Sequence, residues 1–111
     1  LLGQSYEALN DRAYALTLYE EYVASSPSAA IYNQMGLCYA EMGDYENALA
    51  SFDKGLAVEG NSYRQELSYN RVVAYENLGD FENARRFMEE YLKAYPDDEI
   101  AQREYEFLQT R

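Results

Sequence analysis

Two nearly identical stretches decide the fold: GDYENA at residues 43–48 and GDFENA at residues 79–84, which lie 36 residues apart. A glycine adopts at little cost the left-handed conformation that ends many helices. An aspartate directly after it caps the next helix, because its carboxylate accepts hydrogen bonds from the free N–H groups of the first turn. Each stretch therefore predicts that one helix ends at the glycine and another begins after the aspartate.

A larger pattern surrounds these turns and occurs three times. Each copy has an aromatic residue with an alanine nine positions later; the pairs are Tyr6 and Ala15, Tyr39 and Ala48, and Tyr75 and Ala84. The alanines are small where two helices should cross closely, and the tyrosines fill the space beside them. The copies recur after 33 and then 36 residues. A repeat of this length is typical of stacked helical units, each of which covers the apolar face of its neighbour.

The rest of the chain has the spacing of amphipathic helices, and it contains only two prolines. We therefore predict an all-α fold of antiparallel helix pairs, with helices at residues 1–9, 11–25, 28–42, 45–58, 63–78, 81–95 and 98–110. In the first copy, Asn10-Asp11 takes the place of the glycine-aspartate turn. Ser62 and Gln65 predict a capping box at the start of the fifth helix.

These features resemble the tetratricopeptide repeat, a helix–turn–helix unit of 34 residues. The copy at residues 29–62 matches the signature best, through Tyr32, Met35, Gly36, Tyr39, Ala48 and Phe52. The copy at residues 65–98 departs from it at Ser68, where a large aromatic residue is usual, and at Val72, where a small one is usual. The resemblance implies an α-solenoid that winds as a right-handed superhelix.

The chain divides on this basis into one domain, residues 1–111, with a partial repeat at 1–28, two repeats at 29–62 and 65–98, and a capping helix at 99–111. The cap should bring Ile100, Ala101, Tyr105 and Leu108 over an apolar face that includes Phe87, Tyr91 and Leu92. The chain does not begin with methionine and opens inside an apolar helical pattern. We therefore expect it to be a fragment of a longer protein.

The resemblance also implies a binding surface, because the first helix of each repeat in that family lines a concave groove for peptides or helices. Carried over position by position, the candidate groove residues are Gln4, Glu7, Asn33, Leu37, Glu41, Glu66, Tyr69, Asn70, Val73, Glu76 and Asn77, with Ala8, Ala30 and Ala40 beside them. The asparagines suit a peptide backbone, since an amide both donates and accepts. One subgroup of the family grips acidic chaperone C-termini with groove lysines and arginines, and none of the matching positions here is basic.

The charge of the chain points to the class of partner. The formal net charge is −11 and is spread along the sequence. Such a field repels nucleic acids and anionic membranes and favours basic partners. The groove carboxylates, among them Glu41 and Glu76, have no lysine or arginine opposite them in the repeat register, so we expect a neutral or basic protein or peptide. The alternative is that acidity only keeps an apolar repeat protein soluble.

Catalysis and metal binding have little support in this sequence. The chain has no histidine, which is the commonest general base and a common metal ligand. Cys38 is the only cysteine, and no activating base stands near it in the pattern. Helix capping explains Asp44 and the run Asp97-Asp98-Glu99 without a calcium ion. We predict no enzyme activity, no cofactor and no metal. A lone cysteine is compatible with the cytoplasm but does not fix the compartment.

Two functions stay open at this stage. The first is a peptide- or protein-binding module that uses the groove. The second is a structural or self-association spacer within a longer repeat scaffold, in which the N-terminal edge stacks on further repeats. Leu2, Tyr6 and Leu9 lack the missing part of their helix, and Leu18 and Tyr22 lack a preceding repeat. We therefore expect weak homodimers through this edge. No apolar run is long enough to cross a bilayer, and Arg85-Arg86 is interpreted as a solvated helix face.

Overall fold

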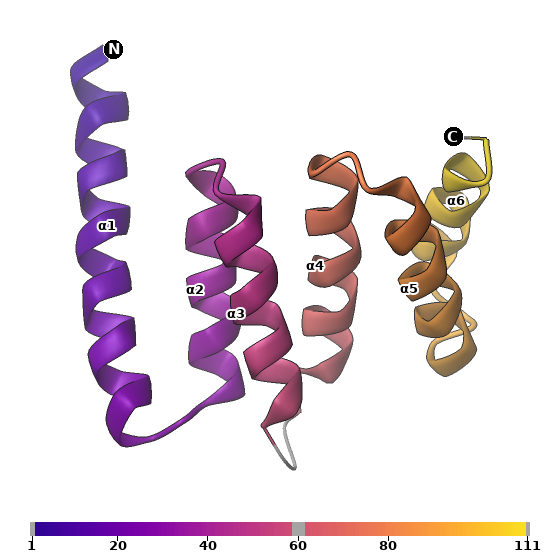
Figure 1. Cartoon of the computed structure of the whole chain (residues 1–111), viewed down its shortest axis with the longest axis horizontal. Coiled ribbons are helices and arrows are strands. Elements are labelled where there is room, and N and C mark those ends of the chain that lie inside the picture. Colours follow the sequence, from indigo (N-terminus) through magenta and orange to yellow (C-terminus); the bar gives the residue numbers. More distant parts are fainter. Residues whose placement is uncertain (1, 59–61, 111) are drawn as a thin grey trace.

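The computed structural model describes the backbone of residues 2–58 and 62–110 and the side chains of residues 11–58 and 62–110. The helices that it contains are α1 (Leu2–Ser25), α2 (Ala29–Glu41), α3 (Tyr45–Ala57), α4 (Arg64–Asn77), α5 (Phe81–Ala94) and α6 (Glu99–Leu108). They follow one another side by side in chain order (Figure 1). Each helix contacts the next, and α2 also contacts α4. The prediction of an all-α fold of sequentially packed helices is confirmed.

The two quoted stretches form the turns that they predicted. Gly43 and Gly79 have φ angles of +81° and +78°, which are left-handed values that a side chain would strain. The Oδ1 atoms of Asp44 and Asp80 each accept a hydrogen bond of 3.3 Å from the backbone N–H three residues later. Local chemistry alone therefore fixes the α2–α3 and α4–α5 connections.

The core consists of two clusters that share α4. In the first cluster, Ala48 and Phe52 of α3 are almost wholly buried beside Leu67 of α4. A methyl group at Gly36 would lie 2.2 Å from the Phe52 ring, so the glycine permits this close approach. In the second cluster, Val72 packs with Ala84 and other buried residues of α5 and α6. Val72 stands where the family pattern has a small residue, and its larger side chain is accommodated in this cluster.

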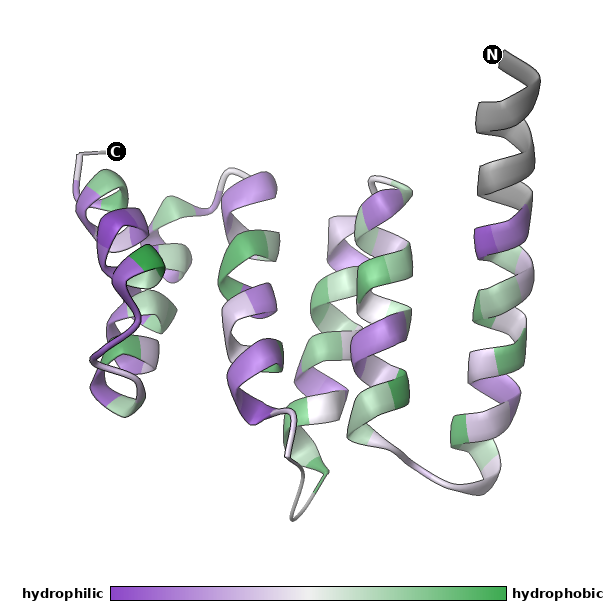
Figure 2. Cartoon of the chain, turned by 180° about the vertical axis from the view of Figure 1, so that it is seen from behind, coloured by the Kyte–Doolittle hydropathy of each residue, from purple (hydrophilic) through white to green (hydrophobic). Residues whose placement is uncertain are grey.

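The last helix, α6, contacts α5 at the position of the predicted capping helix. Ala101 and Leu108 are fully buried against α5, and Figure 2 shows that α6, like its neighbours, carries both apolar and polar residues. Ile100 is the exception, because its side chain is 67% exposed. It follows the N-cap Asp98 by two positions and lies in the first turn of the helix, away from the face that packs on α5.

The prediction of two helices at residues 1–9 and 11–25 is wrong, because α1 is one continuous helix (Figure 1). A turn at Asn10-Asp11 needs a left-handed residue, and no non-glycine residue in the described part of the chain has a positive φ. Such a residue costs about 1–2 kcal/mol, and a segment of nine residues offers little packing in return. Ala15 is consequently half-buried, whereas Ala48 and Ala84 are fully buried.

The predicted capping box at Ser62 is also wrong. The N-cap of α4 is Tyr63, which makes no capping hydrogen bond with its side chain. Gln65 points elsewhere, since its Nε2 donates to the Tyr91 hydroxyl at 3.2 Å. The helix begins one residue too late for Ser62 to occupy the capping position.

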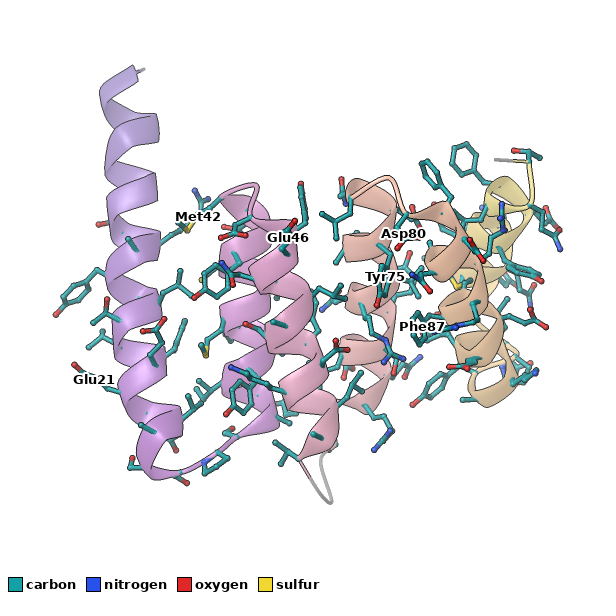
Figure 3. The ribbon with its side chains drawn as sticks, in the orientation of Figure 1. Glu21, Met42, Glu46, Tyr75, Asp80 and Phe87 are labelled. Atoms are coloured by element: carbon teal, nitrogen blue, oxygen red, sulfur yellow. The ribbon has the colours of Figure 1, made fainter. Side chains whose placement is uncertain are left out.

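The α4–α5 contact contains an aromatic and cationic stack. The rings of Tyr75 and Phe87 face each other at 5.3 Å (Figure 3). The Arg71 guanidinium lies 4.1 Å from the Phe87 ring centre. The interpretation of Arg85 as solvated is wrong, because its Nη1 donates to the Leu108 carbonyl at 3.3 Å and ties α5 to the end of α6.

Candidate functional site

A groove with a volume of about 560 Å³ crosses α2, α4 and the start of α6. Its lining residues are Asn33, Leu37, Gln65, Glu66, Tyr69, Asn70, Tyr91, Asp98 and Ile100. Five of the eleven candidate residues from the sequence are among them: Asn33, Leu37, Glu66, Tyr69 and Asn70. They come together because successive first helices, α2 and α4, present equivalent faces to the same side of the solenoid.

A pair of asparagines forms the α2 side of the groove. Asn70 Nδ2 donates to Asn33 Oδ1 at 2.9 Å, and Asn33 is only 7% exposed. Both amides were expected to bind a peptide backbone. One N–H of Asn70 and the carbonyl oxygen of Asn33 are instead used for the hydrogen bond that joins α2 to α4. Each amide still has further donor and acceptor positions.

A network of hydrogen bonds fixes the opposite side. The Tyr91 hydroxyl donates to Asp98 Oδ2 at 2.6 Å and accepts from Gln65, so α4, α5 and the cap of α6 are joined. Burial, with the bond to Asp98, raises the pKa of Tyr91 to about 12. The bond from Tyr91 and the backbone N–H of Ala101 lower the pKa of Asp98. Hydrogen bonds thus join three helices on this side of the groove, which carries a carboxylate at neutral pH.

Tyr69 stands between these two sides and supplies an aromatic surface. Its ring meets that of Tyr91 edge-on, with the centroids 5.7 Å apart. Burial, followed by the charges of Glu104, Glu76 and Asp98, raises the pKa of its hydroxyl. The negative charges of these three carboxyl groups therefore disfavour ionisation of the Tyr69 hydroxyl.

Two of these carboxyls, on Glu76 of α4 and Glu104 of α6, form a pair beside the groove. Burial, followed by the charge of Glu104 and a hydrogen bond with its carboxyl, raises the pKa of Glu76 to about 7. Both side chains are half-buried. Glu104 was absent from the candidate residues, because only the packing of α6 brings it here.

The remaining candidates lie at the margin of the groove or away from it. Val73 lines a small adjoining cavity of about 50 Å³ that also touches Leu37 and Asn70. Asn77 is exposed, and its Nδ2 donates to the Val73 carbonyl within α4. Its place as a candidate groove residue stays a prediction. The side chains of Gln4 and Glu7 lie outside the described residues.

Glu41 requires a correction to the predicted electrostatics. The Nε atom of Arg12 on α1 forms an ion pair with its carboxylate. The expectation that no basic residue opposes the groove carboxylates is therefore wrong at this position. The reason is the continuous α1, which places Arg12 beside the end of α2. Among the described lining residues themselves, Glu66 and Asp98 are acidic and none is basic.

Sequence reasoning missed the contribution of α5 and α6 to the groove. Gln65 was assigned to a cap, Tyr91 to the core beneath the last helix, and Asp98 to the helix start. Asp98 does cap α6, by accepting from the Ala101 N–H at 3.1 Å. The sequence can predict that Asp98 caps a helix, but not that it lines the groove. Its place in the groove depends on how α6 packs against α5.

Cys38, the only cysteine of the chain, is half-buried on α2. Burial, followed by the charge of Glu41, raises the pKa of the Cys38 thiol, which keeps it protonated. Within the described residues, no three histidine, cysteine, aspartate or glutamate side chains gather to hold a metal ion. No described helix is long and apolar enough to span a bilayer.

Comparison with known proteins identifies the repeat. Models described as tetratricopeptide repeat match residues 1–29, 29–65 and 64–105. A thermophilic TPR protein from Thermus thermophilus has a similar fold, with a TM-score of 0.75 and 24% identity. The match covers 90% of this chain and 50% of that one, so the chain spans about half of its length. No curated protein matches the sequence. The chain belongs to the tetratricopeptide repeat family.

Proposed function

We propose that the chain is a non-catalytic module that binds a peptide or a helix of a partner protein in the groove. Tetratricopeptide repeats are generally protein-interaction modules and are typically non-catalytic. The observation that carries the proposal is the open volume of about 560 Å³ lined by residues of α2, α4 and α6. Leu37, Tyr69 and Ile100 offer apolar contact there, and polar groups surround them.

The acidic rim supports a neutral or basic partner over an acidic one. Glu66 and Asp98 line the groove, with Glu76 and Glu104 beside it. A peptide rich in carboxylates would bring like charges together, which costs energy and slows the encounter. The net charge of −11 acts in the same direction at longer range.

A peptide array that spans acidic, neutral and basic sequences tests this function. We expect basic and neutral peptides to bind and acidic ones to be excluded. Binding of basic peptides should weaken as salt is raised, because exposed charges are screened. A consistent preference for acidic C-terminal peptides would contradict the proposed electrostatics. The absence of any bound peptide would contradict the function itself.

The exposed face of α1 supports the second candidate, a self-association spacer. Tyr14, Leu18 and Tyr22 recur at four-residue spacing and are 68%, 47% and 53% exposed. By the repeat spacing, Leu18 and Tyr22 correspond to Phe87 and Tyr91, which pack on α4. Glu21 also lies on the side of α1 away from α2 (Figure 3).

Sedimentation of this chain tests self-association. We expect a weak dimer at high protein concentration, because burying an apolar stripe of this kind between two chains lowers the free energy. Salt should not weaken it, in contrast to the binding of a basic peptide. Leu18→Glu should give a monomer, whereas Thr17→Glu, on a neighbouring exposed position of α1, should not. A strict monomer in the unmodified chain would contradict this second function.

A further inference from the structure

The exposed row on α1 is the same in both directions along the helix. One tyrosine, Tyr14, stands four residues before Leu18, and another, Tyr22, stands four residues after it; all three are exposed. Residues at this spacing lie in one row on a helix surface. The buried Leu16 marks the other side of α1, which contacts α2. The row therefore has the symmetry that a contact between two identical helices requires.

The polar residues beside the row decide how two such helices could be oriented. In an antiparallel pair centred on Leu18, Asp11 would face Ser25 of the partner subunit, and Glu21 would face the partner's Ala15. Neither carboxylate then meets another carboxylate. In a parallel pair each residue would face its own copy, which sets Asp11 against Asp11 and Glu21 against Glu21. Like charges placed opposite each other oppose association, so the sequence of this face favours the antiparallel pair.

A contact of this kind already exists between α4 and α5. These helices run antiparallel (Figure 1). At the positions of α5 that correspond to the last two residues of the α1 row, Phe87 stacks on Tyr75 and Tyr91 meets Tyr69 edge-on. Aromatic pairs in these arrangements contribute more than their buried area alone. The same face of α1 therefore suits an antiparallel helix that presents aromatic side chains.

We propose that two copies of the chain pair through α1 as an antiparallel two-fold dimer, with Leu18 against Leu18 and Tyr14 against the partner's Tyr22. A two-fold contact uses the same patch on both chains, and the symmetric row meets this requirement. Rows at four-residue spacing interdigitate in the commonest class of helix packing. One helix face from each chain buries less than the roughly 1,200 Å² of a stable complex, so the dimer is weak. This inference rests on the second proposed function, self-association, and specifies its geometry.

The response of the dimer to salt follows from the two kinds of surface. The proposed contact is apolar and aromatic, whereas each chain carries a net charge of −11. Repulsion between two such chains opposes association and is screened by salt. Sedimentation of the unmodified chain should therefore show a larger dimer fraction as sodium chloride is raised. A dimer fraction that falls with salt would indicate an interface of ion pairs and would overturn the proposed contact.

Cross-linking through single cysteines tests the geometry. Cys38 is first replaced by serine, because it is the only cysteine of the chain. In this background, Leu18→Cys should form a disulfide-linked dimer under mild oxidation. Tyr14→Cys and Tyr22→Cys should each form little alone, because the new cysteine lies eight residues, or about 12 Å, along the helix axis from its own copy. An equimolar mixture of these two variants should give about tenfold more mixed dimer, since cysteines with Cα atoms more than about 7 Å apart cannot bridge.

A control variant measures random collisions. Glu46→Cys, in the same background, places a cysteine at an exposed position of α3 and should give little dimer (Figure 3). Circular dichroism checks that each variant is folded, and the exposed positions of α1 tolerate substitution. The inference is wrong if Glu46→Cys links as fast as Leu18→Cys. It is also wrong if Tyr14→Cys and Tyr22→Cys each link with themselves as fast as with each other, which is the result of a parallel pair.

The outcomes also distinguish this inference from the proposed self-association. A strict monomer in sedimentation contradicts both. A dimer of the unmodified chain without the mixed disulfide leaves self-association standing and shows that the antiparallel α1 contact is wrong. A mass that grows beyond the dimer with protein concentration indicates a head-to-tail contact, which does not close as a two-fold contact does, and also overturns the inference.

Discussion

At the scale of single residues, the alanines at the helix crossings have the least freedom to change. Ala48 is fully buried between α2 and α3, in the cluster that includes Phe52. Ala48→Glu would force a charge and extra volume into this contact and should destabilise the fold by about 3–5 kcal/mol. Urea unfolding measures this loss. Ala57→Glu, at an exposed position of the same helix, is the matched control. Similar unfolding midpoints for both variants would mean that the repeat register is wrong.

Tyr69 is the residue on which binding should depend most. It lines the groove with its ring, and aromatic residues often carry a large share of interface energy. Tyr69→Ala should weaken the best peptide of the array by about 1–3 kcal/mol, measured by calorimetry. Tyr63→Ala removes a similar side chain just before the same helix, outside the groove, and should have little effect. Unchanged affinity in Tyr69→Ala, with a folded protein, would show that the ligand uses another face.

At the scale of elements, α6 closes the second core cluster. Leu108 is fully buried there. Leu108→Ala should cost about 2–5 kcal/mol by leaving a cavity, measured by chemical unfolding. Ile100→Ala, in the same helix but 67% exposed, should be nearly neutral. A small effect at Leu108 would show that α6 does not act as a cap.

The stability of the fold should respond to pH through Glu76 of α4. The pKa of Glu76 rises in the folded chain from 4.5 to about 7. A raised carboxyl pKa means that folding favours the protonated form, so its contribution is full below about pH 4.5 and is lost as pH rises through 7. Glu76→Gln should therefore raise the melting temperature at pH 8 and change it little at pH 4. A lower melting temperature at pH 8 in this variant would contradict the assigned environment.

The elements also show where sequence reasoning succeeded and where it failed. The turns at Gly43 and Gly79 could be predicted because their conformation follows from the residues themselves. The turn at Asn10-Asp11 could not be judged in this way, since a non-glycine turn forms only if packing compensates its strain. The groove residues of α2 and α4 followed from the repeat. Those of α5 and α6, such as Tyr91 and Glu104, depended on contacts between distant segments.

At the scale of the whole molecule, we propose that this repeat chain holds a neutral or basic peptide in the groove across α2, α4 and α6. The apolar face of α1 offers a competing surface on the same protein, where Leu18 and Tyr22 are exposed. The groove carries an acidic rim, whereas the α1 face presents an apolar stripe. Salt should therefore affect ligands of the two surfaces differently.

The most direct test is NMR mapping of the best array peptide on the intact chain. We predict that the peptide is neutral or basic and that saturating shifts centre on Leu37, Tyr69 and Asn70. For a basic peptide, the affinity should fall as salt is raised. Shifts centred on Leu18 and Tyr22, or a tight acidic ligand in the groove, would contradict it.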